Sequence, residues 1–405
     1  MSLASDGAPG GLRVIVLGYI VRFPVGGNAW PYLQYVMGLA GLGHEVYFAE
    51  DSGDEPWSCY DPVRNVTDTD PDYGLRFTRS AFGRLGLGDR WAYYDAPTRR
   101  WLGPCAGRIL DLCATADVVL NVSGANPLRP WLAEVPTRIL IDTDPVFTQV
   151  RHLTDPARRQ RALAHNAFFS FAENAGSAEC LVPDDGFPWQ PTRQPVALGA
   201  WPITPGPADG KFTTVMQWDS YAALEHEGKR YGMKSDSFSP YFDLPQATGV
   251  NLELAVGSLS APLDLLRGRG WRVVDPRVPT RDPWTYQRYL QDSKGEFGIA
   301  KHGYVVTGSG WFSERSADYL ASGRPAVLQD TGFSRWLPVG RGVVAFDSPE
   351  GAAAALADVN ADYVGHCAAA RALAEEYFGA EKVLTPLLES ALSPAASTTG
   401  RGSRR

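Results

Sequence analysis

The passage from residue 301 to residue 325 carries side chains that can bind a phosphate group. Lys301 and His302 are followed by a loop of small residues, 307–310, and then by a helical pattern over 314–321 with Ser313 as the expected N-cap. Such a loop exposes free N–H groups and the positive end of a helix to an anion. The residues that we predict to bind a nucleoside diphosphate here are Lys301, His302, Ser309, Gly310, Ser313, Arg315, Ser316 and Asp318.

Within this group, Lys301 and Arg315 have a predicted second role. Charge-assisted hydrogen bonds from them would stabilise the negative charge that grows on a departing diphosphate. Asp318, about one turn further along the helix, would accept from ribose hydroxyls. An ordinary capped helix with a solvated charged face is the alternative interpretation of the same residues.

In the first half of the chain, polar residues follow several predicted strands. Ligands of open parallel α/β sheets bind outside the carboxyl ends of the strands, so these loops are expected to line one cleft. Asp142 and Asp144 are predicted as candidates for the general base that deprotonates a hydroxyl. The residues of these loops that we predict to contact a substrate are Gly26, Gly27, Asn28, Ser123, Glu173 and Asn174. Each of these features is also compatible with a turn or a helix cap.

Three loops in the second half add to these predictions. Gln217 and Trp218 end one predicted strand, and Asp275 follows another, so all three are expected to contact a ligand in the same cleft. Asp330 and Thr331 follow a third strand and are predicted to contact sugar hydroxyls. The cluster of acidic residues and histidine at 225–227 has no further ligand at a fixed spacing, so no metal site is expected.

Alternating strand and helix patterns predict α/β architecture with parallel sheets. Apolar runs predict strands at 13–18, 44–50, 117–122, 138–141, 167–171, 212–218, 252–256, 271–274, 297–300, 325–328 and 343–346. Helical patterns lie between them, and a long polar loop is expected after 218. A proline-rich passage, 183–207, suggests the domain boundary. The predicted parts are a first domain at 1–205, a second domain at 206–365, closing helices at 366–392 that can cross back to the first domain, and a disordered tail at 393–405.

Composition limits the choice of partners. The 405 residues carry a net charge of -7, which argues against a protein that binds phosphate backbones, so no nucleic acid partner is expected. The five cysteines lack the spacing of a zinc site and are expected to be reduced. Neither a signal peptide nor a long apolar run is evident, so we expect a cytoplasmic protein without integral membrane contact.

The segment from Asp318 through Gly323 to Pro325 resembles the donor motif of nucleotide-sugar-dependent glycosyltransferases of the GT-B fold, such as families 1 and 4. That motif has an acidic residue, a short apolar stretch, glycine, a variable residue and proline. The resemblance implies two Rossmann-like, doubly wound parallel-sheet domains that face a cleft. It implies that the first domain, 1–205, binds the acceptor or its sugar hydroxyls and that the second, 206–365, binds the donor, with its base near Asp275. Two departures leave retention or inversion of configuration undecided: Gly310 stands where retaining members often have a glutamate, and no histidine follows the first strand.

The resemblance therefore implies a metal-independent transferase that moves a sugar from a UDP-, GDP- or dTDP-sugar to a hydroxyl or amine of a natural product or glycan. No cofactor beyond this nucleotide-sugar substrate is expected. An epimerase or hydrolase acting on the same donor, and a non-catalytic protein that binds sugar nucleotides, are the alternatives. A NAD-dependent dehydrogenase is disfavoured because the glycine pattern G-x-G-x-x-G is absent after the first strand. The oligomeric state stays open.

Overall fold

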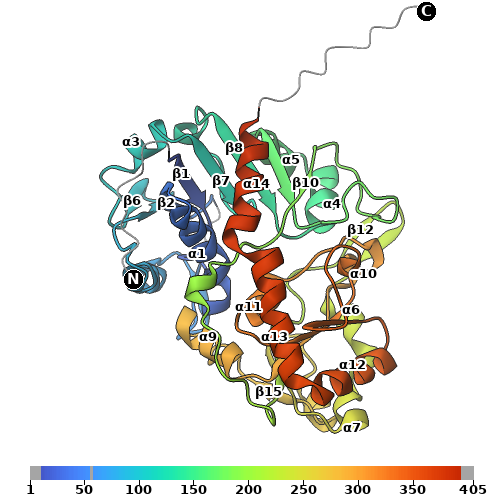
Figure 1. The fold of residues 1–405 in the computed structure, drawn as a ribbon. Helices are drawn as coiled ribbons and strands as arrows, with labels where there is room; N and C mark the ends of the chain where they lie inside the picture. Colours follow the sequence, from blue (N-terminus) through green and yellow to red (C-terminus); the bar gives the residue numbers. More distant parts are fainter. Residues whose placement is uncertain (1–10, 55–57, 394–405) are drawn as a thin grey trace, which may run out of the picture.

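A computed structural model describes residues 11–54 and 58–393, and its chain forms two lobes that each contain a parallel sheet (Figure 1). The first sheet has eight strands in the order β10-β9-β8-β7-β1-β2-β5-β6. Its neighbouring strands pair in parallel, except that β5 and β6 pair antiparallel. The strands are β1 (Arg13–Leu17), β2 (Glu45–Asp51), β5 (Trp91–Asp95), β6 (Arg100–Leu102), β7 (Val118–Val122), β8 (Thr137–Asp142), β9 (Ala167–Ser170) and β10 (Gln190–Pro191).

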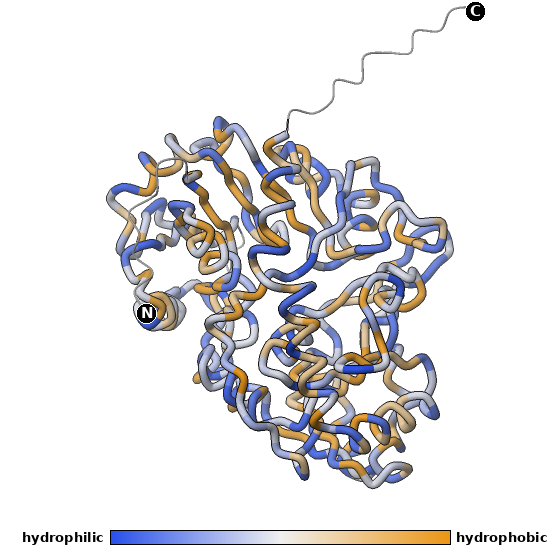
Figure 2. Tube along the Cα trace, in the orientation of Figure 1, coloured by the Kyte–Doolittle hydropathy of each residue, from blue (hydrophilic) through white to orange (hydrophobic). Residues whose placement is uncertain are grey.

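Helices cover this sheet because its strands are apolar on both faces. Val14, Val16, Leu120 and Ile139 are completely buried in the first core, and Figure 2 shows the apolar strands inside the lobe. The helices of the lobe are α1 (Gly26–Gly41), α2 (Asp72–Arg84), α3 (Ile109–Ala114), α4 (Phe147–Thr154) and α5 (Pro156–Leu163). A small hairpin of β3 (Cys59–Asp61) and β4 (Val66–Asp68) and a short 3-10 helix, η1 (Pro130–Leu132), complete it.

The second sheet has six strands in the order β15-β14-β11-β16-β17-β18, and all its pairs are parallel. They are β11 (Phe212–Gln217), β14 (Leu252–Gly257), β15 (Arg272–Val274), β16 (Gly295–Gly298), β17 (Ala326–Gln329) and β18 (Val343–Phe346). The accompanying helices are α8 (Leu263–Gly268), α9 (Pro283–Gln291), α10 (His302–Thr307), α11 (Glu314–Ala321) and η4 (Phe333–Arg335). The predicted class, two Rossmann-like α/β sheets, is confirmed.

The polar loop predicted after residue 218 is largely structured, so this expectation is wrong. It contains β12 (Leu224–His226), β13 (Lys229–Tyr231), α6 (Lys234–Phe238), η3 (Ser239–Tyr241) and α7 (Leu244–Thr248). Trp218 and Phe238 lie 4.9 Å apart between ring centroids, and Phe238 also packs on Trp271. These aromatic contacts join residues distant in sequence, and therefore no local periodicity reveals them.

After β18 the chain closes the molecule with helices. They are α12 (Pro349–Ala361), α13 (Tyr363–Leu373), the π-helix η5 (Ala374–Phe378) and α14 (Ala380–Leu392). Figure 1 shows α13 beside the second lobe and α14 against the first, where α14 contacts α1 and β8. The connection between the sheets holds η2 (Leu198–Ala200), and Val196 there bonds to both Phe378 and Ala380 through the backbone. Apart from Ser393, the predicted tail lies outside the described residues.

The lobes are joined directly by α1, which packs on α9 and faces α11. Trp30 Nε1 of α1 donates to the carbonyl of Pro283 at 2.6 Å, and Gln34 Nε2 donates to Asp318 Oδ1 at 2.6 Å. A side chain on Gly26 would put its Cβ 2.3 Å from the carbonyl oxygen of Asp282. The glycine therefore permits close packing of the two lobes. No helix within residues 11–54 and 58–393 combines the length and apolar character needed to cross a membrane.

Candidate active site

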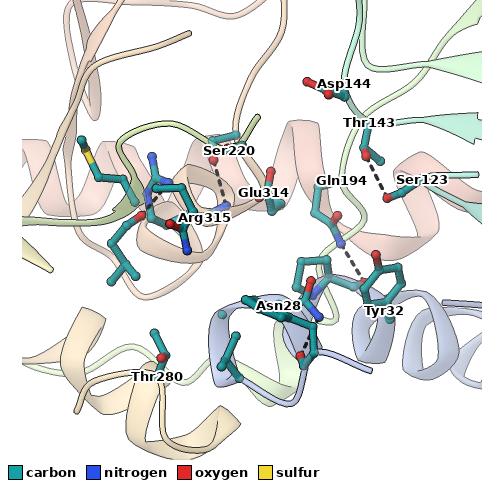
Figure 3. A pocket seen from close by; sticks show the side chains of 18 of the residues that line it. Asn28, Tyr32, Ser123, Thr143, Asp144, Gln194, Ser220, Thr280, Glu314 and Arg315 are labelled. Carbon is teal, nitrogen blue, oxygen red and sulfur yellow. Dashed lines mark hydrogen bonds between the residues drawn. The ribbon is translucent and has the colours of Figure 1, made fainter. Parts of the chain in front are cut away.

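A cavity of about 400 Å³ lies between the carboxyl ends of the two sheets. It sits where the strand order of each sheet reverses, between β1 and β7 in the first lobe and between β11 and β16 in the second, which is where such sheets bind ligands. Figure 3 shows side chains from both lobes converging on it. Its lining includes Gly27, Asn28, Tyr32, Ser123, Thr143, Asp144, Gln194, Gln217, Ser220, Lys234, Arg277, Thr280, Lys301, Tyr304, Trp311, Ser313, Glu314 and Arg315.

Arg315 brings a fixed positive charge to the second-lobe wall. Its Nε donates to Glu296 Oε1 at 2.6 Å and its Nη1 to the carbonyl of Val215 at 3.0 Å. Burial lowers the pKa of Arg315 and the Glu296 carboxylate raises it, and the balance lies above the usual value. Glu296 is completely buried, so the guanidinium is held rigidly at the edge of the cavity.

Lys234 is a second cation of this wall, which the sequence analysis missed. It begins α6 and is only 8% exposed. Within the described parts of the chain, no hydrogen bond or ion pair to its ammonium is present. Burial, with the positive charges of Arg315 and Lys301, holds the pKa of Lys234 well below its usual range. A buried cation without a counter-ion is costly, and a bound anion would relieve that cost.

The start of α11 also faces the cavity. Ser313 Oγ caps the helix by accepting from the amide of Arg315 at 3.3 Å, and the first turn presents the positive end of the helix. Glu314, the first residue of α11, lines the cavity, and its carboxylate has no hydrogen bond or ion pair to the rest of the described chain. In Figure 3 its carboxylate lies between Arg315 and the side chains of the first lobe.

Asp144 joins the two lobes across the cavity. Its carboxylate accepts from Lys301 Nζ at 2.8 Å and from the hydroxyls of Tyr221 and Tyr304, all three in the second lobe. Burial raises the pKa of Asp144, but the Lys301 charge and the hydrogen bonds from Lys301, Tyr221 and Tyr304 together outweigh it, so the pKa is lowered. A carboxylate with occupied lone pairs and a lowered pKa is a weak base. The arrangement favours a positioning role for Asp144 and Lys301.

Asp142, the other predicted base, lies outside this cavity. It is 2% exposed and accepts from Thr148 Oγ1 at 2.6 Å, Gln149 Nε2 at 2.9 Å and Ser170 Oγ at 2.7 Å. Burial raises its pKa despite these hydrogen bonds. Its position within a hydrogen-bonded core does not support the predicted contact with a substrate hydroxyl.

Asp318, predicted to bind ribose, does not line the cavity. It is 1% exposed, and its Oδ1 accepts from Gln34 of the opposite lobe. One helical turn rises by about 5.4 Å, so Asp318 is set back from Glu314 and covered by α1. Ser316 is buried on the same helix, and its hydroxyl has no partner within the described chain.

We expect Asp318→Ala to lower the free energy of unfolding by about 1–3 kcal/mol, because the amide of Gln34 loses its acceptor. Burial raises the pKa of Asp318 well above its ordinary value. The protonated acid is thus favoured in the folded state, and stability should fall as pH rises through the raised pKa. Asp318→Asn keeps the acceptor without the charge and should remain stable at pH 8. Urea unfolding at pH 5 and pH 8 tests this, and UDP affinity lost without any loss of stability would contradict it.

Only some of the residues predicted to bind the donor line the cavity. Gln217, Lys301, Ser313 and Arg315 line the cavity, whereas the remaining ones do not. Trp218 is buried against Phe238, His302 Nδ1 accepts from the amide of Gly232, and the amide of Gly310 donates to the carbonyl of Thr331. Ser309 is completely buried. Asp275 pairs with Arg277, and it is Arg277 that lines the cavity.

Likewise, only some of the residues predicted to bind the acceptor line the cavity. Gly27, Asn28 and Ser123 line the cavity, whereas Gly26 serves lobe packing. The other four have partners within the protein. Glu173 pairs with Arg193, and Asn174 Nδ2 donates across the lobes at 2.9 Å to the carbonyls of Gly308 and Gly332. Asp330 caps the turn that follows it, and Thr331 is buried. Asn174 and Thr331 hold the loop before α11 in place, and none of these four residues lines the cavity.

The two sheets and the cleft between them define the GT-B fold, and solved structures agree with this. An alpha-glucosyltransferase in complex with UDP and DNA has a TM-score of 0.55 at 9% identity, covering 94% of this chain and 100% of its own. HepE of Anabaena, in complex with UDP and glucose, has a TM-score of 0.53 at 10% identity, covering 95% and 100%. AviGT4, a glycosyltransferase of avilamycin A biosynthesis, has a TM-score of 0.51 at 16% identity, covering 94% and 97%. No protein-family model and no curated protein sequence matches the chain.

The prediction from net charge that this protein has no nucleic acid partner is wrong. An alpha-glucosyltransferase of this fold is found in complex with DNA, in one structure with DNA that contains an abasic site. Net charge describes the whole surface, whereas an acceptor meets one cleft, whose local charge can differ in sign.

Proposed function

We propose that this protein is a glycosyltransferase that moves a sugar from a nucleotide-sugar donor to an acceptor. The observation that carries the proposal is the buried Lys234 beside Arg315 and the start of α11, in the cleft of a GT-B fold. The Lys234 ammonium has no hydrogen bond or ion pair among the residues that the structure describes. Two cations and a helix N-terminus at one wall suit a diphosphate. Structures of the same fold in complex with UDP support a nucleotide-sugar donor.

In the proposed reaction, the bond between the anomeric carbon and the diphosphate oxygen breaks, and a bond forms between that carbon and an acceptor oxygen or nitrogen. Lys234 and Arg315 stabilise the negative charge of the departing nucleoside diphosphate, a role that needs no divalent metal. Ser313 and the amides of the first turn of α11 add to this stabilisation. Closure of the lobes around the site keeps water away from the donor.

The acceptor side of the proposal is the first lobe, with Asn28, Ser123 and Thr143. Ser123 Oγ and Thr143 Oγ1 are 2.8 Å apart and line the cavity together (Figure 3). We propose that Glu314 is the general base that accepts the proton of the acceptor hydroxyl, because its carboxylate in the cavity has no protein partner within the described chain. Asp144 and Lys301 position the two lobes relative to each other.

Glu314→Gln is expected to lower kcat of transfer by about 10²–10⁴-fold, since the amide keeps the shape but cannot accept a proton. UDP affinity should change little, because the diphosphate contacts remain. Steady-state kinetics together with UDP titration measure both quantities. A rise in the donor KM at constant kcat would instead assign Glu314 to binding a donor hydroxyl.

The proposed function is tested by calorimetric titration with UDP, GDP and dTDP, followed by donor consumption with and without acceptors. Binding of one nucleotide, with consumption of its sugar only when an acceptor is present, is the expected result. Consumption without any acceptor would assign the chain to hydrolysis or epimerisation. Absence of binding by all three nucleotides would overturn the proposal. We also propose a cytoplasmic location, where the free cysteines stay reduced.

A further inference from the structure

A second cavity, of about 300 Å³, opens beside the candidate active site in the first lobe; we call it the side cavity. Ser123, Thr143 and Asp144 line both cavities. A molecule that places a hydroxyl at Ser123 and Thr143 can therefore extend into the side cavity. This continuity makes the side cavity part of the acceptor path.

Arginines of α4 and α5 give the side cavity a positively charged lining. Arg151, Arg158 and Arg161 all line it. Arg161 is exposed, and its guanidinium forms no ion pair or hydrogen bond with the part of the chain that the structure describes. Arg158 lies 3.4 Å from Asp155 with over half of its side chain exposed, and Arg151 reaches Asp144 at 3.5 Å. Most of the guanidinium donors at this opening are therefore available to a ligand.

The two carboxylates that line this cavity, Asp142 and Asp144, do not offset these charges. Asp144 is paired with Lys301 at 2.8 Å. Asp142 has its oxygens occupied by Thr148, Gln149 and Ser170 and lies at the buried end. His165 is neutral at physiological pH, because burial lowers its pKa to about 4. The accessible charge of the side cavity is positive, so it favours an anion over a neutral group.

We propose that the acceptor carries an anionic group, a phosphate or a carboxylate, which binds Arg158 and Arg161 in the side cavity while its hydroxyl faces the donor. The inference rests on the proposed function and adds the chemical class of the acceptor. The bend between α4 and α5 positions both arginines: Asp155 caps α5 by accepting from the amides of Ala157 and Arg158, and Pro156 fixes the first turn.

Three probes with one common ring test the inference: glucose, glucuronate and glucose 6-phosphate. The protein is first saturated with the nucleotide that it was found to bind, and each probe is then titrated into it calorimetrically. We expect one or both anions to bind at least tenfold more tightly than glucose. The anion that binds identifies carboxylate or phosphate as the recognised group.

The Arg158→Gln/Arg161→Gln double variant should bind the anionic probes about tenfold or more weakly than the unmodified protein does. Its nucleotide affinity should be unchanged, because neither arginine lines the donor wall. Arg79→Gln removes an exposed charge of α2 that lines neither cavity and should change nothing. Equal binding of glucose and the anions, or an unchanged double variant, would overturn the inference. So would a DNA oligonucleotide that binds when neither anion does. Nucleotide binding in any of these cases would leave the proposed function standing.

Discussion

Replacing Arg315 with leucine is expected to lower the free energy of unfolding by about 3–5 kcal/mol and to abolish measurable UDP binding. Glu296 is completely buried, and its hydrogen bond from Arg315 at 2.6 Å compensates its charge. Its second oxygen, Oε2, has no partner within the described residues. Removing the guanidinium therefore leaves an uncompensated carboxylate in the core of the second lobe.

The Glu296→Leu/Arg315→Leu double variant separates the two effects. With both charges removed, stability should recover most of the loss, since an apolar pair can replace a buried ion pair at little cost. UDP binding should not recover, because the diphosphate still lacks its cation. Urea unfolding and calorimetry of both variants provide the measurement. Additive losses of stability, or full UDP affinity in the double variant, would contradict the assigned role of Arg315.

Lys234→Met is expected to weaken UDP binding by about 10- to 100-fold, the effect of one charge-assisted contact to a phosphate. The protein itself should be at least as stable as before, because the variant removes a buried amine whose charged form is disfavoured by burial. Loss of affinity without loss of stability distinguishes a ligand contact from a structural one. Lys229→Met, which removes an exposed charge on β13 of the same lobe, is the matched control.

The same lysine predicts the pH dependence of binding. Its pKa is depressed in the free protein, and a diphosphate would raise it, so binding takes up a proton. UDP affinity should therefore fall as pH rises from 7 to 9, a range above the second pKa of a phosphate at about 6. The slope should vanish in Lys234→Met. A slope that persists unchanged in this variant would assign the titrating group elsewhere.

Much of the fold follows from the sequence because the strands are buried on both faces. Apolar runs at 13–18 and 212–218 identify β1 and β11, and the ends of such strands point to the loops that line a cleft. Ser123, Asp144, Lys301 and Arg315 were predicted for the site in this way, and all four line the cavity. Their roles stay predictions until the variants are measured.

Which side chains of those segments face the cavity depends on packing that sequence patterns do not contain. Glu314 and Asp318 lie on the same face of α11, yet α1 of the other lobe covers Asp318 and leaves Glu314 in the cleft. Lys234 reaches the cavity because aromatic contacts distant in sequence fold the segment after β11.

The sequence by itself determined two α/β lobes and the strand-end loops that carry the candidate site. The tertiary structure decided which carboxylates and cations are accessible there, because contacts between the lobes bury some polar residues and expose others. Burial also sets the direction of their pKa shifts, so the chemistry available at the cleft is fixed by packing across the lobes.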